Sequence, residues 1–328
     1  MNTDRPSLKR EFLEKHNFGD CKIIELVPDA SRRTYSRLIN KNGDSYILMD
    51  APPEHESVGS FIKVTNTLRS MHLSAPEIIH FDEKEGFVML EDLGDDSINK
   101  FISNNPHFEE EYYLKCVDVL STVYQNFSEH NHYDNYDINY FLKEGKIFAD
   151  YCIYSPSRST TENEELNHEY KELLTSLYDL ILEPTKKTLV LRDYHADNLH
   201  ILPMRKGVNS IGLLDYQDAL VGHPCYDLMS LLEDARRDVG AATVHKCVDK
   251  FISDNSFDHQ DFMFAYYIWA LQRNLKIVGI FNRKVYRDGN LNYQKFLPRV
   301  WRYIIGDINQ PHLMYFKNFI EKVIQPVG

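Results

Sequence analysis

The stretch LRDYHADNLHILPMRKGVNSIGLLDYQDA, residues 191–219, decides the fold. Asp193 and Asn198 bracket a polar loop between two short β-rich runs, TLVL and LHIL. A further carboxylate, Asp215, comes directly after the next run, IGLL. Residues that carry chemistry are concentrated on loops that a rigid scaffold positions, so we expect the site in these loops.

These three side chains are the set that phosphoryl transfer from a nucleotide needs. One carboxylate orients and deprotonates the attacking hydroxyl, and hard oxygen ligands hold Mg²⁺ on the phosphates. Asp193 precedes Asn198 by five residues, so one rigid loop is able to hold the base and a metal-binding amide together. The second metal carboxylate, Asp215, is expected to come from the neighbouring hairpin.

The loop resembles the catalytic loop of the aminoglycoside phosphotransferase and choline-kinase-like family of small-molecule kinases, which are relatives of protein kinases. That loop reads H-x-D-x-H-x-x-N and is followed by a strand that ends in a metal-binding Asp. The resemblance implies Asp193 as catalytic base, Asn198 and Asp215 as Mg²⁺ ligands, and His195 as a histidine that either braces the loop or takes part in catalysis. Leu191 departs from the pattern, because it replaces the family's first His.

The resemblance extends over most of residues 20–305, through DASRRTYSRLI, YILMDAPPEH, GFVMLEDLG, LDYQDALVGHPCYDLMSLLEDARRD and QRNLKIVGIF. These segments are similar to the subgroup that includes the anomeric kinase of N-acetylmuramate and N-acetylglucosamine, which acts in cell-wall recycling. They imply an α+β, bilobal protein-kinase-like fold, with a small β-rich N-lobe at 1–92 and a larger helical C-lobe at 93–328. ATP is expected in the cleft between the lobes, and an amino sugar is the expected acceptor.

The nucleotide side departs from the usual pattern in two ways. The first hairpin carries no G-x-G-x-x-G, and backbone amides with Ser31, Arg32 or Arg33 are expected to contact the phosphates instead. The strand YILMD lacks the expected phosphate-binding Lys and has Leu48 and Met49 in its place. We hypothesise that a hairpin arginine substitutes, since a guanidinium group holds phosphate oxygens in a bidentate way.

Other polar residues are assigned from their surroundings. Adenine is expected against the backbone of the segment that contains Met89 and Glu91. Asp227 precedes an amphipathic helix and is interpreted either as its N-cap or, following the resemblance, as a brace for the catalytic loop. Arg273 is either structural or part of the acceptor pocket, because buried polar groups need partners. Asp218 is expected to support or approach the metal or the acceptor, and Asp150 is a candidate acceptor contact.

Composition limits the possible partners. With 37 basic and 49 acidic residues the net charge is -12, which argues against a general binder of nucleic acid or anionic membranes. The 5 cysteines form no C-x-x-C pair, so a reduced cytoplasmic setting is expected, with no disulfide framework. The apolar run FMFAYYIWAL is about half the roughly 20 residues of a membrane span and predicts a buried helix. No obligate protein partner is inferred.

Two local patterns predict chain geometry. The strands TYSRLI and SYILM are joined by NKNGD, whose Asn42 and Gly43 suit the left-handed backbone of a tight hairpin turn. Thr161 and Glu164 have the spacing of a capping box at the start of a helix.

Two alternative functions remain open. A kinase for choline, ethanolamine or an aminoglycoside would suit the acidic charge. A nucleotide-binding pseudokinase is motivated by the absent strand Lys and the missing His before Asp193, although Asp193, Asn198 and Asp215 argue against it. A protein kinase is disfavoured, because D-Y-Q replaces D-F-G and no A-P-E segment follows.

Overall fold

The computed structural model describes residues 4–26, 33–54, 56–128 and 133–324, and the chain forms two compact units. Unit 1 consists of Met1–Asn104 with Ala196–Ala219, and unit 2 consists of Asn105–His195 with Leu220–Gly328. The chain therefore passes from unit 2 to unit 1 between His195 and Ala196, inside the predicted catalytic loop. The lobe boundary expected after residue 92 stays a prediction.

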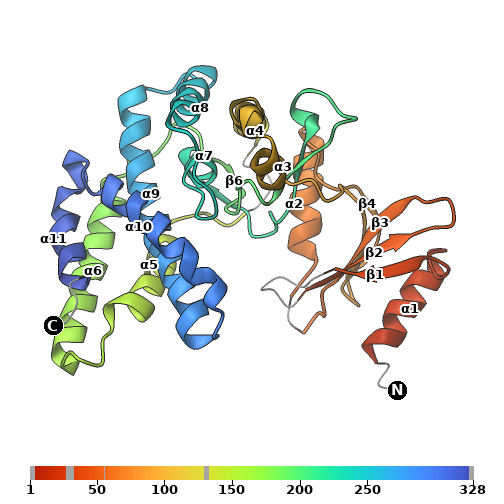
Figure 1. The fold of residues 1–328 in the computed structure, drawn as a ribbon, viewed down its shortest axis with the longest axis horizontal. Helices are drawn as coiled ribbons and strands as arrows, with labels where there is room; N and C mark the ends of the chain where they lie inside the picture. The colour runs from red at the N-terminus through yellow and green to blue at the C-terminus, as the bar shows by residue number, and fades with distance from the viewer. Residues whose placement is uncertain (1–3, 27–32, 55, 129–132, 325–328) are drawn as a thin grey trace. The chain divides into compact units, whose positions relative to one another are not determined.

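Unit 1 is built on a five-stranded antiparallel sheet, with the strand order β1-β2-β3-β5-β4 (Figure 1). The strands are β1 (Lys22–Glu25), β2 (Thr34–Ile39), β3 (Ser45–Asp50), β4 (Ile78–Asp82) and β5 (Phe87–Glu91). The predicted strands TYSRLI and SYILM are thus confirmed as β2 and β3.

Helix α1 (Arg5–Lys15) covers one face of this sheet. Because side chains alternate along a strand, every second residue of β2, β3 and β5 faces the helix. The buried cluster between them contains Phe12, Leu13, Leu38, Leu48, Phe87 and Met89. Leu48 and Met89 therefore serve the core of this unit through their side chains.

Five residues, 40–44, separate β2 from β3, and the hydrogen bond between Asn40 and Asp44 leaves three of them, 41–43, in the turn itself. The amide of Gly43 donates to the carbonyl of Asn40 at 3.1 Å, and the amide of Asn40 donates to the carbonyl of Asp44 at 3.0 Å. Gly43 has φ +90°, but Asn42 is absent from the positive-φ residues of the described chain. The expected left-handed backbone is thus confirmed only at Gly43, because a three-residue loop needs it at a single position.

The segment 196–219 is joined to unit 1 by backbone hydrogen bonds. It contains the hairpin β7 (Leu199–Ile201) and β8 (Ile211–Leu213). The helices of unit 1 that precede it are α2 (Gly59–Ser70) and α3 (Ile98–Asn104). The amide of Asn99 donates to Ala196, that of Ile201 to Asp96 and that of Leu213 to Ser74, at 2.9 to 3.0 Å. These bonds hold the hairpin in register with the rest of the unit.

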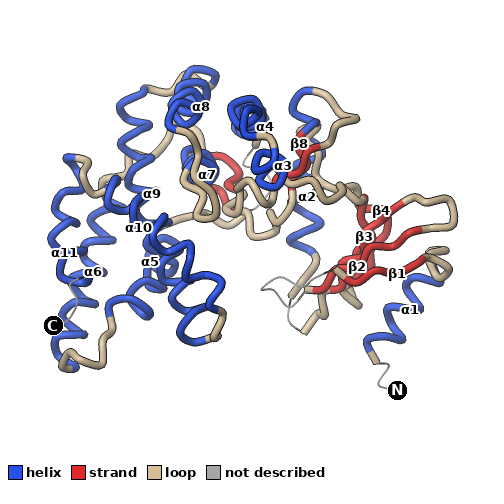
Figure 2. The backbone as a smooth tube through the Cα atoms, viewed as in Figure 1, coloured by secondary structure: helices blue, strands red, loops and turns tan. Residues whose placement is uncertain are grey.

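Unit 2 is mostly helical (Figure 2). Its helices are α4 (Glu109–Asn126), α5 (Ile138–Phe148), α6 (Thr160–Asp179), α7 (Cys225–Leu232), α8 (Ala241–Asp254), α9 (His259–Asn282), α10 (Leu297–Asp307) and α11 (Met314–Ile324). Two short strands, β6 (Thr188–Val190) and β9 (Leu220–Gly222), pair in antiparallel fashion.

Helix α9 is the centre of unit 2 and packs against α5, α7 and α10. The apolar run FMFAYYIWAL forms residues 262–271 of this helix and is largely buried, so the predicted buried helix is confirmed. A Cβ atom built at Gly279 would lie 2.6 Å from the carbonyl of Ile147, so glycine permits the close approach of α9 to α5. Over the residues that the structure describes, every helix is too short or too polar to span a membrane.

The start of α6 corrects one prediction. Ser159 is the N-cap, its hydroxyl accepts from the amide of Glu162, and the Glu162 carboxylate accepts from the amide of Ser159 at 2.7 Å. The capping box expected at Thr161 and Glu164 is wrong, because the same S/T-x-x-E pattern occurs two residues earlier and the helix begins there.

Candidate active site

The loop after β6 presents Asp193 at an exposed position. Its backbone is unusual, because the preceding residue, Arg192, has φ +72°. This left-handed conformation costs free energy in a residue other than glycine, and such residues are common at functional sites. The surrounding contacts must therefore hold the chain in this shape.

Asp227 supplies one of these contacts. Its carboxylate accepts from the backbone amides of Leu191 at 2.6 Å and of Arg192 at 2.9 Å. Asp227 lies in the first turn of α7, whose N-cap position is occupied by Pro224, so the side chain does not cap that helix. Burial raises the pKa of Asp227 to about 7, against the two amide hydrogen bonds that favour its ionised form.

His195 lies inside unit 2 and is 5% exposed. Its Nε2 atom is 3.1 Å from a guanidinium nitrogen of Arg236, and its amide donates to the carbonyl of Asp193 at 3.1 Å. Burial and the positive charge of Arg236 hold the pKa of His195 well below its usual value, so the ring is neutral at pH 7. These contacts favour a structural role for His195 in the loop over a role as proton donor in catalysis.

Asn198 and Asp215 meet in unit 1, at the end of the β7–β8 hairpin. The side-chain amide of Asn198 lies 3.3 Å from a carboxylate oxygen of Asp215, and the amide of Leu214 donates to the carbonyl of Asn198 at 3.0 Å. Asp215 has φ +58° and accepts a bond from Gln217 at 3.0 Å. Among the described residues, no group of three His, Cys, Asp or Glu side chains has metal-binding geometry. An amide and a carboxylate suit Mg²⁺ that binds mainly through phosphates.

Tyr216, the residue next to Asp215, is anchored to α2. Its hydroxyl lies 2.8 Å from the hydroxyl of Thr65, and its ring stacks on Phe61 with the centroids 5.5 Å apart. The aromatic residue of D-Y-Q is therefore buried against a helix of the same unit.

Arg33 is the one residue of the predicted phosphate-binding trio that lies within the described chain, since Ser31 and Arg32 lie outside it. It is 9% exposed and forms an ion pair with Glu56. Burial raises the pKa of Tyr35, and this hydroxyl also interacts with Arg33 and, electrostatically, with Asp215. Arg33 and Asp215 thus both interact with Tyr35.

Met89 and Glu91 occupy different positions at the expected adenine segment. Met89 is a central-strand residue that pairs with Leu48 and His80. Glu91, at the end of β5, forms an ion pair with Arg205.

Arg37 holds the segment that follows β5, residues 92–95, which we call the linker. Its guanidinium donates to Asp92 at 2.6 Å and to Asp95 at 2.7 Å. No pattern in the sequence points to these ion pairs, since an arginine on a strand gives no signal of its partner.

The remaining three candidates occur on different segments of the chain. Asp218 is exposed in unit 1. Asp150, in the π-helical turn Ala149–Ile153, pairs with the exposed Lys146 at 2.7 Å. Arg273 is buried in α9 and donates to the hydroxyl of Ser230 at 2.8 Å.

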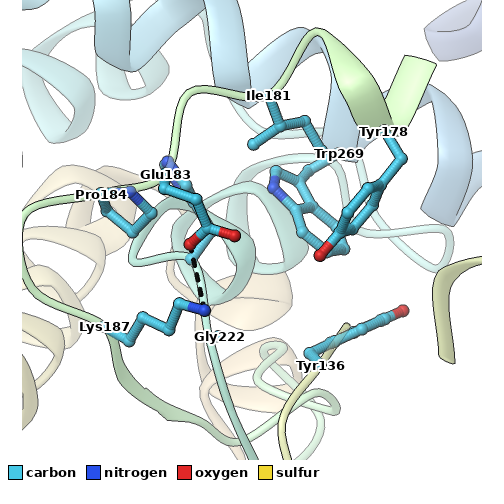
Figure 3. A pocket seen from close by; sticks show the side chains of 9 residues that line it. Tyr136, Tyr178, Ile181, Glu183, Pro184, Lys187, Gly222 and Trp269 are labelled. Atoms are coloured by element: carbon cyan, nitrogen blue, oxygen red, sulfur yellow. Dashed lines mark ion pairs between the residues drawn. The ribbon is translucent and has the colours of Figure 1, made fainter. Parts of the chain in front are cut away.

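A pocket in unit 2 lies at the other end of β6, beside Lys187 (Figure 3). Tyr136, Tyr178 and Trp269 supply aromatic walls, and Lys187 pairs with Glu183 at 3.0 Å. None of the predicted site residues lines this pocket.

Comparison with known proteins adds independent findings. Residues 22–255 match the model of the phosphotransferase enzyme family. The chain is 29% identical over 360 residues to the N-acetylmuramate/N-acetylglucosamine kinase of Caulobacter vibrioides, and the match covers 99% of this chain and 98% of that protein.

Solved structures share the fold at low sequence identity. Ethanolamine kinase from Plasmodium vivax matches with a TM-score of 0.65 and 9% identity, over 91% of this chain and 86% of that one. The GDP complex of aminoglycoside 2'-phosphotransferase-IIIa matches with a TM-score of 0.62 and 14% identity, over 89% of this chain and 97% of that one. The predicted α+β protein-kinase-like fold is thus confirmed.

Proposed function

Because the chain belongs to the phosphotransferase enzyme family, we propose that it transfers the γ-phosphoryl group of ATP to the anomeric hydroxyl of N-acetylmuramate or N-acetylglucosamine. The observation that carries the proposal is the clamped backbone that presents an exposed Asp193. The acceptor is proposed from the Caulobacter vibrioides relative, which the chain matches over 99% of its length. A cell-wall recycling role in the cytoplasm would follow from that acceptor.

In this proposal Asp193 is the general base. Its carboxylate orients the acceptor hydroxyl and takes the proton as the oxygen attacks the γ-phosphorus. The new oxygen–phosphorus bond forms while the bond between that phosphorus and the ADP oxygen breaks, and ADP leaves. His195 and Asp227 hold the loop that carries the base.

Asn198 and Asp215 are the proposed ligands of Mg²⁺. The amide oxygen of Asn198 and the carboxylate of Asp215 are the hard ligands that this ion prefers. The side-chain NH2 group of Asn198 donates to Asp215 at 3.3 Å, which keeps the two side chains next to each other. When bound, Mg²⁺ neutralises negative charge on the phosphates. Asp218, which follows closely in the chain, is proposed to support this site or the acceptor.

On the nucleotide side, Arg33 is proposed to replace the missing strand Lys. Its ion pair with Glu56 fixes a guanidinium close to Tyr35, which also interacts with Asp215. Ser31 and Arg32 are proposed as further phosphate contacts, and the backbone around Met89 and Glu91 as the adenine contact. Asp150 remains a proposed acceptor contact, and Arg273 a proposed support.

A panel of acceptors tests the proposal. The protein is incubated with Mg·ATP and N-acetylmuramate, N-acetylglucosamine, choline, ethanolamine or kanamycin, and ADP release and the ³¹P NMR spectrum are recorded. We expect an anomeric sugar phosphate. Phosphorylation of only the amino alcohols or kanamycin would contradict the proposed acceptor. Binding of Mg·ATP without turnover of any acceptor would instead support a pseudokinase.

A further inference from the structure

Contacts hold the backbone amide, the backbone carbonyl and the side chain of Arg192. Its amide donates to Asp227 at 2.9 Å, and its carbonyl accepts from the hydroxyl of Ser230 at 3.3 Å. Ser230 in turn accepts from Arg273 at 2.8 Å. The guanidinium of Arg192 pairs with Glu144. These contacts act on the left-handed residue directly before Asp193.

Glu144 is a buried carboxylate of α5 that three donors share. Besides Arg192, it accepts from the ammonium group of Lys276 at 2.7 Å and from the hydroxyl of Tyr136. The side chains of Glu144 and Lys276 are 8% and 14% exposed, so solvent screens this cluster weakly. Tyr136 lies in the loop before α5, Lys276 lies in α9 and Arg192 lies in the catalytic loop, so Glu144 joins three segments of unit 2.

The charges of this cluster are balanced only when Asp193 is counted. Arg192 and Lys276 are cations, and each interacts electrostatically with Asp193. Burial acts to raise the pKa of Glu144, but Lys276 and Arg192 outweigh it and hold the pKa below its usual value, so Glu144 is ionised. Two cations and two carboxylates therefore interact in this cluster. Without Glu144, both cations would compete for Asp193, the group that must orient the acceptor hydroxyl.

We propose that Glu144 is a positioning residue for phosphoryl transfer, which holds Arg192 and Lys276 and thereby fixes the orientation of Asp193. The inference rests on the proposed function, because it assumes that Asp193 is the base. Glu144 acts through Arg192 and is not itself assigned a contact with substrate. Its effect is expected on kcat, since a small displacement of a reacting group lowers the rate by about 10²-fold.

Glu144→Gln removes the charge and keeps an oxygen that accepts from Arg192. We expect kcat to fall by about 10- to 100-fold, while KM for ATP changes by less than about twofold. The double variant Glu144→Gln with Lys276→Met removes one cation with the anion, and it is expected to recover about fivefold in kcat over Glu144→Gln. Glu144→Asp keeps the charge and is expected to retain more activity than Glu144→Gln. Glu169→Gln, which removes the charge of a surface partner of Lys322, is the matched control.

Hydrogen exchange gives a readout that needs no acceptor. The amides of Leu191 and Arg192 are expected to exchange faster in Glu144→Gln than in the wild type, with α8 and α9 unchanged. An unchanged kcat, or a rise in exchange spread over all of unit 2, would overturn the inference. If the wild type phosphorylates no acceptor, the proposed function fails, and exchange at these two amides still decides whether Glu144 holds the loop.

Discussion

Asp227 of α7 accepts hydrogen bonds from the backbone amides of both Leu191 and Arg192, at 2.6 and 2.9 Å. Leu191 replaces the histidine that the family resemblance implies at this position, and the loop is supported by a carboxylate that binds its backbone. Side-chain identity at position 191 then matters less, because the contact uses an amide that every residue except proline has.

Replacement of Asp227 by alanine should disrupt both stability and turnover. The two amides would lose their partner in a buried place, which costs on the order of 1 to 3 kcal/mol each. We expect a lower melting temperature and a fall in kcat of about 10²-fold, with KM for ATP nearly unchanged. Thermal unfolding and steady-state kinetics check this. Asp249→Ala, at an exposed position of α8, is the control, and equal kinetics in the two variants would contradict the role of Asp227.

Replacement of Asp215 by asparagine should weaken Mg²⁺ binding. The variant keeps the size of the side chain but loses its charge, so the concentration of Mg²⁺ that gives half-maximal rate is expected to rise by about tenfold or more. Titration of activity with MgCl₂ at saturating ATP measures this. An unchanged midpoint would exclude Asp215 as a metal ligand.

Arg37 should influence nucleotide binding through the linker. It joins β2 to Asp92 and Asp95, and Asp92 also accepts from the hydroxyl of Ser45. Without the guanidinium group the linker loses its anchor, so Arg37→Ala is expected to raise KM for ATP about three- to tenfold and to change kcat little. Lys41→Ala, which removes an exposed ion pair with Asp20, is the control. Equal KM values in the two variants would contradict the anchor.

A buried carboxylate pair should make stability depend on pH. The side-chain amide of Asn274 lies 2.6 Å from Glu233 and 3.3 Å from Asp307. Burial, and then the neighbouring Glu233, raise the pKa of Asp307 well above 3.8. The folded state thus retains a proton that the unfolded state loses, so the stability that this pair contributes is fully present below about pH 4 and is lost as pH rises through the folded pKa.

The variant Asp307→Asn cannot ionise at this position. As pH rises from 5 to 9, its free energy of unfolding is expected to fall less than that of the wild type. At the alkaline end, the variant is expected to have the larger free energy of unfolding of the two proteins. Urea unfolding at several pH values measures the difference. Parallel curves for the two proteins would show that this pair does not set the pH dependence.

Local patterns predicted the fold well where the sequence repeats a simple rule. The alternation in TYSRLI and SYILM gives β2 and β3, and the apolar run at 262–271 gives the interior of α9. A capping pattern that occurs twice in neighbouring positions is harder to assign to one helix start. Ser159 and Thr161 both begin an S/T-x-x-E pattern, and only the course of the chain decides that Ser159 is the cap.

Contacts between distant residues lie beyond such rules. The family resemblance predicts that Asn198 and Asp215 meet at one metal ion, and the structure brings their side chains within 3.3 Å. Glu144 was missed, although it contacts Arg192 and Lys276, since 48 and 132 residues separate it from these partners. No spacing in the sequence indicates such a pair. The role of each site residue in catalysis stays a prediction.

The comparison of wild type with Asp193→Asn in the ³¹P NMR assay tests the central claim most directly. Asparagine has nearly the same shape but cannot accept the hydroxyl proton, and loss of a general base lowers the rate by about 10²- to 10⁴-fold. The account predicts an anomeric phosphate signal from N-acetylmuramate or N-acetylglucosamine with the wild type, and at least a hundredfold slower appearance of that signal with a folded Asp193→Asn variant. Near-wild-type turnover by the variant would contradict it.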